Sequence, residues 1–170
     1  MAHLKIAATT TPVAPAKVEF SYETANLFDT VSLQSTYMTK QMVTPTGVNI
    51  GEDYALSEDE RDAFNLSLDI TMSEIFEIFL KQTSGIQDAY LITDSEVKVT
   101  ILDNNAYNNN VLTLVDMAIK DCIVAGGLKG WFEVCSHADL FKMSNERYFM
   151  SKEILKRRLF QLKKRRAFAS

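Results

Sequence analysis

The chain has 170 residues, 46% of them hydrophobic and 24% charged, and its mean hydropathy is -0.07. This composition argues against a disordered chain and a membrane-spanning one, and the length fits one domain with a buried core. The only cysteines, Cys122 and Cys135, are too few for a disulfide framework, and the absence of a CxxC pattern and of a nearby histidine pair argues against a zinc site. We therefore expect a domain that folds in water without an export signal, a disulfide or a metal.

The formal net charge of -4 conceals a strong asymmetry along the chain. Residues 1–150 carry 10 basic and 21 acidic side chains, whereas residues 151–170 carry 8 basic side chains and one acidic one. An acidic body followed by a basic tail is the feature of this sequence that a function has to explain.

The N-terminal part of the chain divides into three predicted segments. Residues 1–19 are rich in small and polar residues and contain Pro12 and Pro15, which predicts a flexible arm. A helix is expected from Ser21 to about Gln41, because apolar residues recur there on one helical face. A loop is expected over residues 43–54, where proline and glycine interrupt the periodicity.

The clearest helix signal begins at Ser57, where Ser57 and Glu60 have the spacing of a capping box. A stripe of apolar residues follows, and the helix is expected to end near Lys81. Residues 89–102 then alternate between apolar and polar side chains on either side of Asp94 and Ser95, which predicts a β-hairpin.

Two further helices are expected in the C-terminal half. The segment from Val111 to Phe132 is apolar on more than one face, which is typical of a helix at the centre of a bundle or against another subunit. The last helix is predicted over about residues 144–166, with a leucine stripe and a basic end.

The predicted fold is mainly α, a bundle of about four helices with a small β-hairpin between the second and third long helices. Residues 20–170 would form this single domain.

No pattern in the sequence indicates catalysis or a cofactor. Gly126, Gly127 and Gly130 lack the preceding strand and the lysine-serine ending of a phosphate-binding loop, so we interpret them as points where another helix approaches closely or where the helix kinks. Cys135 and His137 could pair as nucleophile and base, but a capping or loop histidine is the simpler interpretation. We therefore predict a protein without enzymatic activity, cofactor or metal.

Two groups of residues are candidates for contacts with partners. Trp131 and Phe132 are expected to be anchors in the core or in an interface. The second group is the basic end of the last helix: Arg157, Arg158, Lys163, Lys164, Arg165 and Arg166. This end could dock in an acidic groove of another protein, could bind nucleic acid through phosphates, or could be a solvated surface. Protein docking is favoured slightly over nucleic acid, because the aromatic and glycine residues typical of RNA binders are missing.

Several blocks of the sequence resemble a known class of virion proteins. The blocks are LQSTYMTKQM (33–42), YALSEDERDAFNLSLDITMSEIFEIF (54–79), LTLVDMAIKDCIVAGGLKGWFEVC (112–135) and the basic helix KEILKRRLFQLKKRR (152–166). In this order they resemble small neck proteins of tailed bacteriophages, which form the head-to-tail connector rings beneath the portal. The likeness is closest to those of phages that infect gut Bacteroidetes, including the crAss-like group.

The resemblance implies a non-enzymatic subunit that assembles with identical copies into a closed ring, usually of twelve. Such a ring would stack on the portal protein, touch adjacent neck or tail proteins and enclose the channel for packaged DNA, without contact with a membrane. The implied location is the neck of the virion, after synthesis in the host bacterial cytoplasm. A small nucleic-acid-binding module that uses the basic C-terminal helix is the alternative function.

Overall fold

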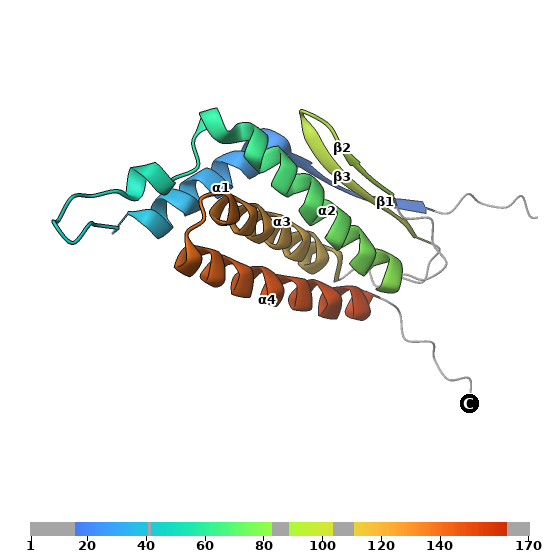
Figure 1. Cartoon of the computed structure of the whole chain (residues 1–170). Helices are drawn as coiled ribbons and strands as arrows, with labels where there is room; N and C mark the ends of the chain where they lie inside the picture. The colour runs from blue at the N-terminus through green and yellow to red at the C-terminus, as the bar shows by residue number, and fades with distance from the viewer. Residues whose placement is uncertain (1–15, 41, 83–88, 104–110, 163–170) are drawn as a thin grey trace, which may run out of the picture.

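The computed structural model describes residues 16–40, 42–82, 89–103 and 111–162 (Figure 1). They form four helices and a small antiparallel sheet, which confirms the predicted fold class. In chain order the elements are β1 (Ala16–Glu23), α1 (Thr24–Thr39), the 3-10 turns η1 (Gly51–Tyr54) and η2 (Glu58–Glu60), α2 (Arg61–Gln82), β2 (Ala89–Ile92), β3 (Glu96–Asp103), α3 (Leu112–Val134) and α4 (Ala138–Leu162).

Helix α3 is the centre of the bundle. It packs against α4 on one side and against α2 and α1 on the other, and Figure 1 shows it between α2 above and α4 below. Its seven consecutive residues from Cys122 to Leu128 are all buried. A helix that is apolar on more than one face was expected at the centre of a bundle or against another subunit, and the structure shows the first of these.

The glycines of α3 allow α2 to approach it closely. A Cβ atom at Gly126 would overlap the side chain of Thr71, and one at Gly130 would overlap the side chain of Ser67. Both of these neighbours lie on α2, one turn apart. The interpretation of the glycines as a site of close helix approach is therefore confirmed, and the conformational cost of glycine in a helix is offset by this packing.

The sheet has one more strand than the predicted hairpin. β2 and β3 form that hairpin, and β1 pairs antiparallel with β3 along its whole length, from Ala16 opposite Asp103 to Glu23 opposite Glu96. The strand order is β1-β3-β2. The apolar side chains of the inner face join the core shared with the helices: Phe20, Tyr22, Val97, Val99 and Ile101.

Strand β1 corrects two predicted boundaries. The arm expected over residues 1–19 cannot extend past residue 15, because the strand begins at Ala16; residues 1–15 lie outside the described part. The first helix begins at Thr24 rather than at Ser21, because Ser21 is still paired with Lys98 in the sheet. The alternation of Val18, Phe20 and Tyr22 was the signal for this strand.

Both long helices next to α3 have recognisable starts. The predicted capping box is present ahead of α2, where the Ser57 backbone N–H donates to the Glu60 carboxylate at 3.0 Å. Helix α4 begins at Ala138, six residues earlier than predicted, after a short turn in which Ser136 has a positive φ of 55°. The turn lets the chain reverse at once, so α4 lies antiparallel along α3.

Candidate interaction surfaces on helices α2 and α4

The buried side of α4 follows a regular spacing of four, four and three residues. This stripe comprises Leu140, Ser144, Tyr148, Ser151, Leu155, Leu159 and Leu162. It faces α3 and holds the helix in the bundle. Every other position of α4 is left at the surface or at the rim of the bundle.

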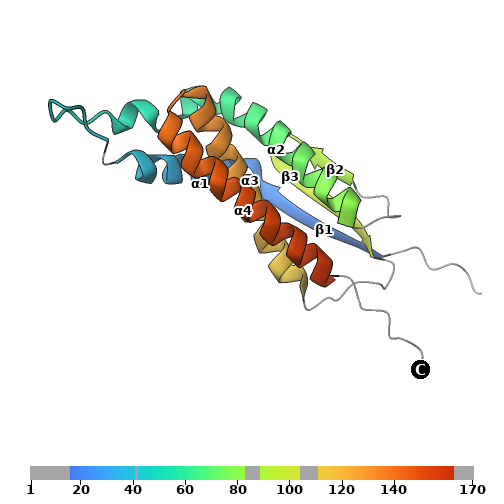
Figure 2. The same cartoon turned by 60° about the horizontal axis from the view of Figure 1, so that its bottom comes forward.

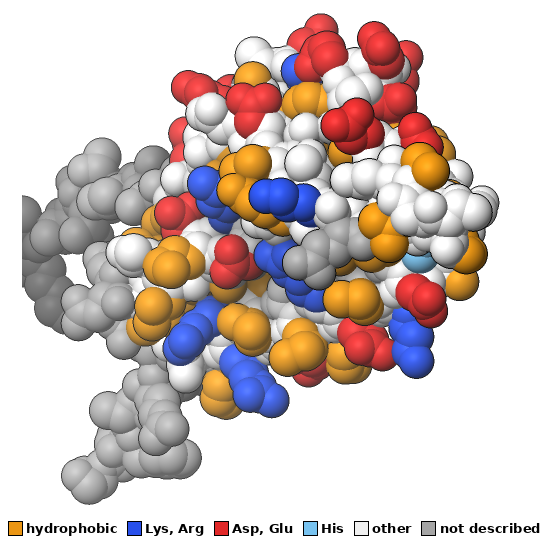
Figure 3. Space-filling model, turned by 90° about the vertical axis from the view of Figure 1, so that its left-hand side faces the viewer, with side chains coloured by type: hydrophobic (Ala, Val, Ile, Leu, Met, Phe, Trp, Pro, Cys, Tyr) orange, Lys and Arg blue, Asp and Glu red, His pale blue; other side chains and the backbone are white. Residues whose placement is uncertain are grey.

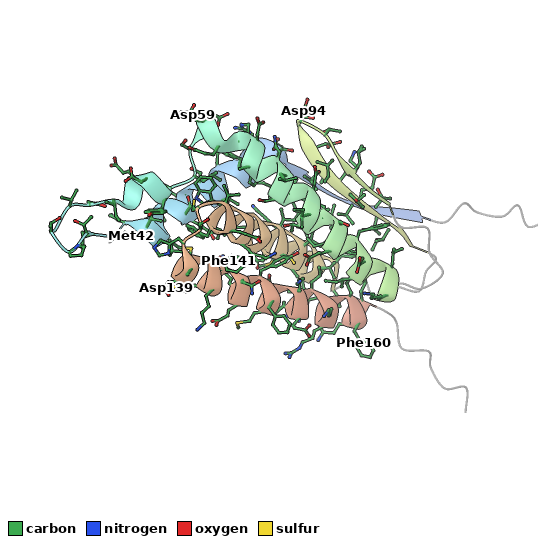
Figure 4. The ribbon with its side chains drawn as sticks, viewed as in Figure 1. Met42, Asp59, Asp94, Asp139, Phe141 and Phe160 are labelled. Atoms are coloured by element: carbon green, nitrogen blue, oxygen red, sulfur yellow. The ribbon has the colours of Figure 1, made fainter. Side chains whose placement is uncertain are left out.

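The outward side of α4 is nevertheless apolar. Five large side chains on it are between 47% and 68% exposed: Met143, Phe149, Met150, Ile154 and Phe160. Exposed charged side chains lie among them, the cations Lys142, Arg147 and Arg157 and the acids Asp139 and Glu146. We call these ten residues the α4 outer face. In Figure 4, Phe160 points away from the bundle at its lower edge.

A groove runs along one flank of this face, between α3 and α4. It has a volume of about 470 Å³ and is lined by Ala118, Asp121, Met143, Glu146, Arg147, Met150, Ser151 and Ile154. Figure 2 shows α4 lying along α3 on this side. Methionine at two positions of the lining gives an adaptable apolar surface, which is common where proteins bind one another.

The opposite flank of α4 meets α2 across an ion pair. Lys152 Nζ lies 2.6 Å from Glu74 Oε2, and the Tyr148 hydroxyl donates to the same oxygen at 3.2 Å. Partial burial raises the pKa of Glu74, but the hydrogen bonds from Lys152 and Tyr148 and the charge of Lys129 outweigh it, so the pKa is lowered. Glu74 therefore stays ionised and ties the two helices together.

Helix α2 also presents apolar side chains outward, but with acidic neighbours. Leu66, Ile70 and Leu80 are between 48% and 62% exposed, and Asp62, Asp69 and Glu77 lie exposed among them. We call these six residues the α2 outer face. In Figure 3, acidic side chains gather toward the top of the view, whereas Lys and Arg side chains lie among hydrophobic ones farther down.

The predicted contact residues differ in how exposed they are. Phe132 is fully buried and Trp131 is 5% exposed, with its indole N–H donating to the Tyr54 carbonyl at 2.8 Å. Of the two alternatives for this pair, the core is favoured, because neither ring is available to another molecule. Arg157 is exposed and Arg158 is half-buried, while residues 163–166, the rest of the basic end, lie outside the described residues.

The other chemical candidates have structural roles. The Nδ1 atom of His137 accepts from the Leu140 backbone N–H at 3.3 Å and caps α4, as the simpler interpretation predicted. Burial raises the pKa of the Cys122 thiol to about 12, so it is not a thiolate at neutral pH. Among the residues that the structure describes, no three His, Cys, Asp or Glu side chains are grouped to hold a metal, and no helix could cross a membrane.

Sequence reasoning missed most of the exposed apolar side chains. Of the two outer faces, it named Arg157 as part of the basic end, but it did not identify an exposed apolar stripe on either helix. The signal that could have revealed these faces is the recurrence of apolar residues on α2 and α4 at positions outside the spacing of the buried stripe.

Comparisons with protein-family models, curated proteins and solved structures find no match to this chain.

Proposed function

We propose that the chain is a non-enzymatic structural protein of a bacteriophage virion, a subunit of the head-to-tail connector ring. In this role it docks on the portal and encloses the channel through which the DNA passes. Its partners are identical copies in a closed ring of about twelve, the portal protein and the adjacent neck or tail proteins.

The observation that carries the proposal is the α4 outer face. Five large apolar side chains on one helix are exposed, and no other described segment of the chain covers them. Exposed apolar surface of this kind, interspersed with cations, is typical of a subunit whose partner supplies the remaining cover. A groove beside it adds a place for a complementary side chain to insert.

The resemblance of the sequence to neck proteins supports the same role. The blocks 54–79, 112–135 and 152–166 fall largely on α2, α3 and α4, which together build the bundle and its two outer faces. The likeness thus concerns the residues that shape the surface of the subunit.

The experiment is protein mass analysis of purified phage particles whose genome encodes this chain. We expect the chain in intact virions at a fixed ratio to the portal protein, about one to one for matched rings. Co-expression with that portal should yield a complex that co-purifies through size-exclusion chromatography. Absence of the chain from virions would refute the proposal.

A nucleic-acid-binding module remains the second candidate, because residues 151–170 carry eight cations. It predicts retention on a duplex DNA column at low salt, steep loss of binding as salt rises, and loss on deletion of residues 163–170. Large apolar side chains between the cations of α4 favour a protein partner over phosphate. If the full-length chain binds DNA and does not join virions, this second function replaces the first.

A further inference from the structure

The two outer faces carry opposite net charge. The exposed charged side chains of α2 are Asp62, Asp69 and Glu77, with the single cation Lys81. Those of α4 are Lys142, Arg147 and Arg157, with the acids Asp139 and Glu146. Each face also has at least three exposed large apolar side chains, so the pair is complementary in both charge and hydrophobicity.

We infer that the α4 outer face of one molecule docks on the α2 outer face of a second copy, in a head-to-tail contact. The inference deepens the proposed function and rests on it for the closure of such contacts into a ring. The contact itself follows from the surfaces of the chain.

Charge selects the head-to-tail arrangement over a symmetric dimer. A two-fold dimer through α4 would bring together two faces of net positive charge, and one through α2 would bring together two faces of net negative charge. Like charges repel in a desolvated contact, whereas α4 against α2 brings faces of opposite net charge together. The apolar side chains Met150 and Ile154 on one face and Leu66 on the other would be covered in the same contact.

The positions of the faces allow the contact to repeat. Helix α2 lies above α3 and α4 lies below it in Figure 1, and the two helices meet along one edge, where Lys152 pairs with Glu74. Their outer faces are separate sets of exposed residues. After one contact, each molecule of a pair retains a free face that is complementary to a further copy. A heterologous contact of this type continues until it closes into a ring, or extends as a filament.

Reciprocal charge reversal tests the contact. The first variant, Arg147→Glu with Arg157→Glu, makes the α4 outer face acidic, and the second, Asp69→Lys with Glu77→Lys, makes the α2 outer face basic. All four side chains are exposed, so both variants should fold, which circular dichroism and thermal melting would verify. A matched control, Glu19→Lys with Lys40→Glu, reverses two exposed charges on neither face.

Sedimentation velocity at low salt gives the readout. We expect the wild-type chain and the control to self-associate, and each reversed variant alone to associate about tenfold more weakly or not at all. Mixing the two reversed variants in equal amounts should restore association, because each altered face then meets an oppositely charged one.

Three outcomes would overturn the inferred contact: a wild-type chain that stays monomeric, a discrete dimer that charge reversal leaves unchanged, or a mixture that does not recover. The experiment is independent of the proposed function. If the mixture recovers while the chain is absent from virions, the contact stands and the connector role fails. If the chain is present in virions but the mixture stays dissociated, the role stands and this contact fails.

Discussion

The Lys152 ammonium and the Glu74 carboxylate, which are 2.6 Å apart, join α4 to α2 across the opening between the two helices. Because the Tyr148 hydroxyl donates to the same carboxylate oxygen, this corner of the bundle is held by a small network. It fixes the relative position of the two helices that carry the outer faces, and any contact that uses both faces depends on that spacing.

Replacing Glu74 with Gln should make stability less dependent on acid. The pKa of Glu74 is lowered in the folded chain, so its contribution is complete above its ordinary value of 4.5 and is lost as the pH falls through the folded value. We expect a loss of about 0.5 kcal/mol at neutral pH, because the pair is partly open to solvent. The difference in unfolding free energy between wild type and variant should shrink as the pH falls below 4.5 and through the lowered pKa of the folded chain. A difference that persists unchanged in acid would contradict the ionised pair, and Glu133→Gln, at an exposed position of α3, is the matched control.

Alanine in place of Gly126 should destabilise the bundle by about 1–3 kcal/mol, because its methyl group would overlap Thr71. The adjacent Gly127 provides the comparison. A Cβ there would lie 3.1 Å from Val31 Cγ2, a contact that a small shift relieves, and alanine favours a helix by about 1 kcal/mol over glycine. Denaturant unfolding should rank Gly127→Ala close to wild type and Gly126→Ala well below it. Equal stability of the two variants would argue against the tight approach of α2.

Truncation of Phe132 and of Met150 compares a core side chain with an exposed one. The ring is fully buried, so Phe132→Ala should cost about 3–5 kcal/mol in unfolding free energy, measured at protein concentrations where the chain is monomeric. Met150→Ala should change the stability of the monomer by less than about 0.5 kcal/mol, because this side chain is 64% exposed, but should weaken self-association. The core assignment of Phe132 is wrong if its truncation leaves the monomer unaffected.

Removal of the His137 cap should loosen the start of α4. His137→Ala leaves the Leu140 N–H without its acceptor, and we expect a loss of about 1 kcal/mol in thermal or chemical unfolding. His137→Asn retains an oxygen acceptor at this position and should recover most of the stability. If the asparagine variant is as unstable as the alanine variant, the packing of the ring against Tyr54 matters more than the cap.

Local signals in the sequence were sufficient to predict the helices and the hairpin. The spacing of Ser57 and Glu60 predicted the capping box, and the change from helical periodicity to alternation of apolar and polar residues near Val97 predicted a strand. Apolar residues on more than one face of α3 indicated a place at the centre of the bundle or against another subunit, and the structure has the helix at the centre. These features depend on neighbours within a few residues, so periodicity and capping rules detect them.

Strand β1 and the outer faces depend on distant residues, which explains why they were missed. Val18 is paired with Ile101, more than 80 positions away, and the strand adjoins a proline-containing segment that resembles a linker. In α4 the spacing of the leucines predicted the buried stripe that includes Leu155, but it did not tell whether the apolar side chains that flank this stripe are covered. The packing of the neighbouring helices decides that Ile154 is exposed.

Electron microscopy of the full-length chain, alone and with the portal protein of the same genome, tests the central claim most directly. The account predicts closed rings of the chain, coaxial with the portal, in which α4 of each subunit lies against α2 of the next. Monomers that leave portal rings without added density would contradict it.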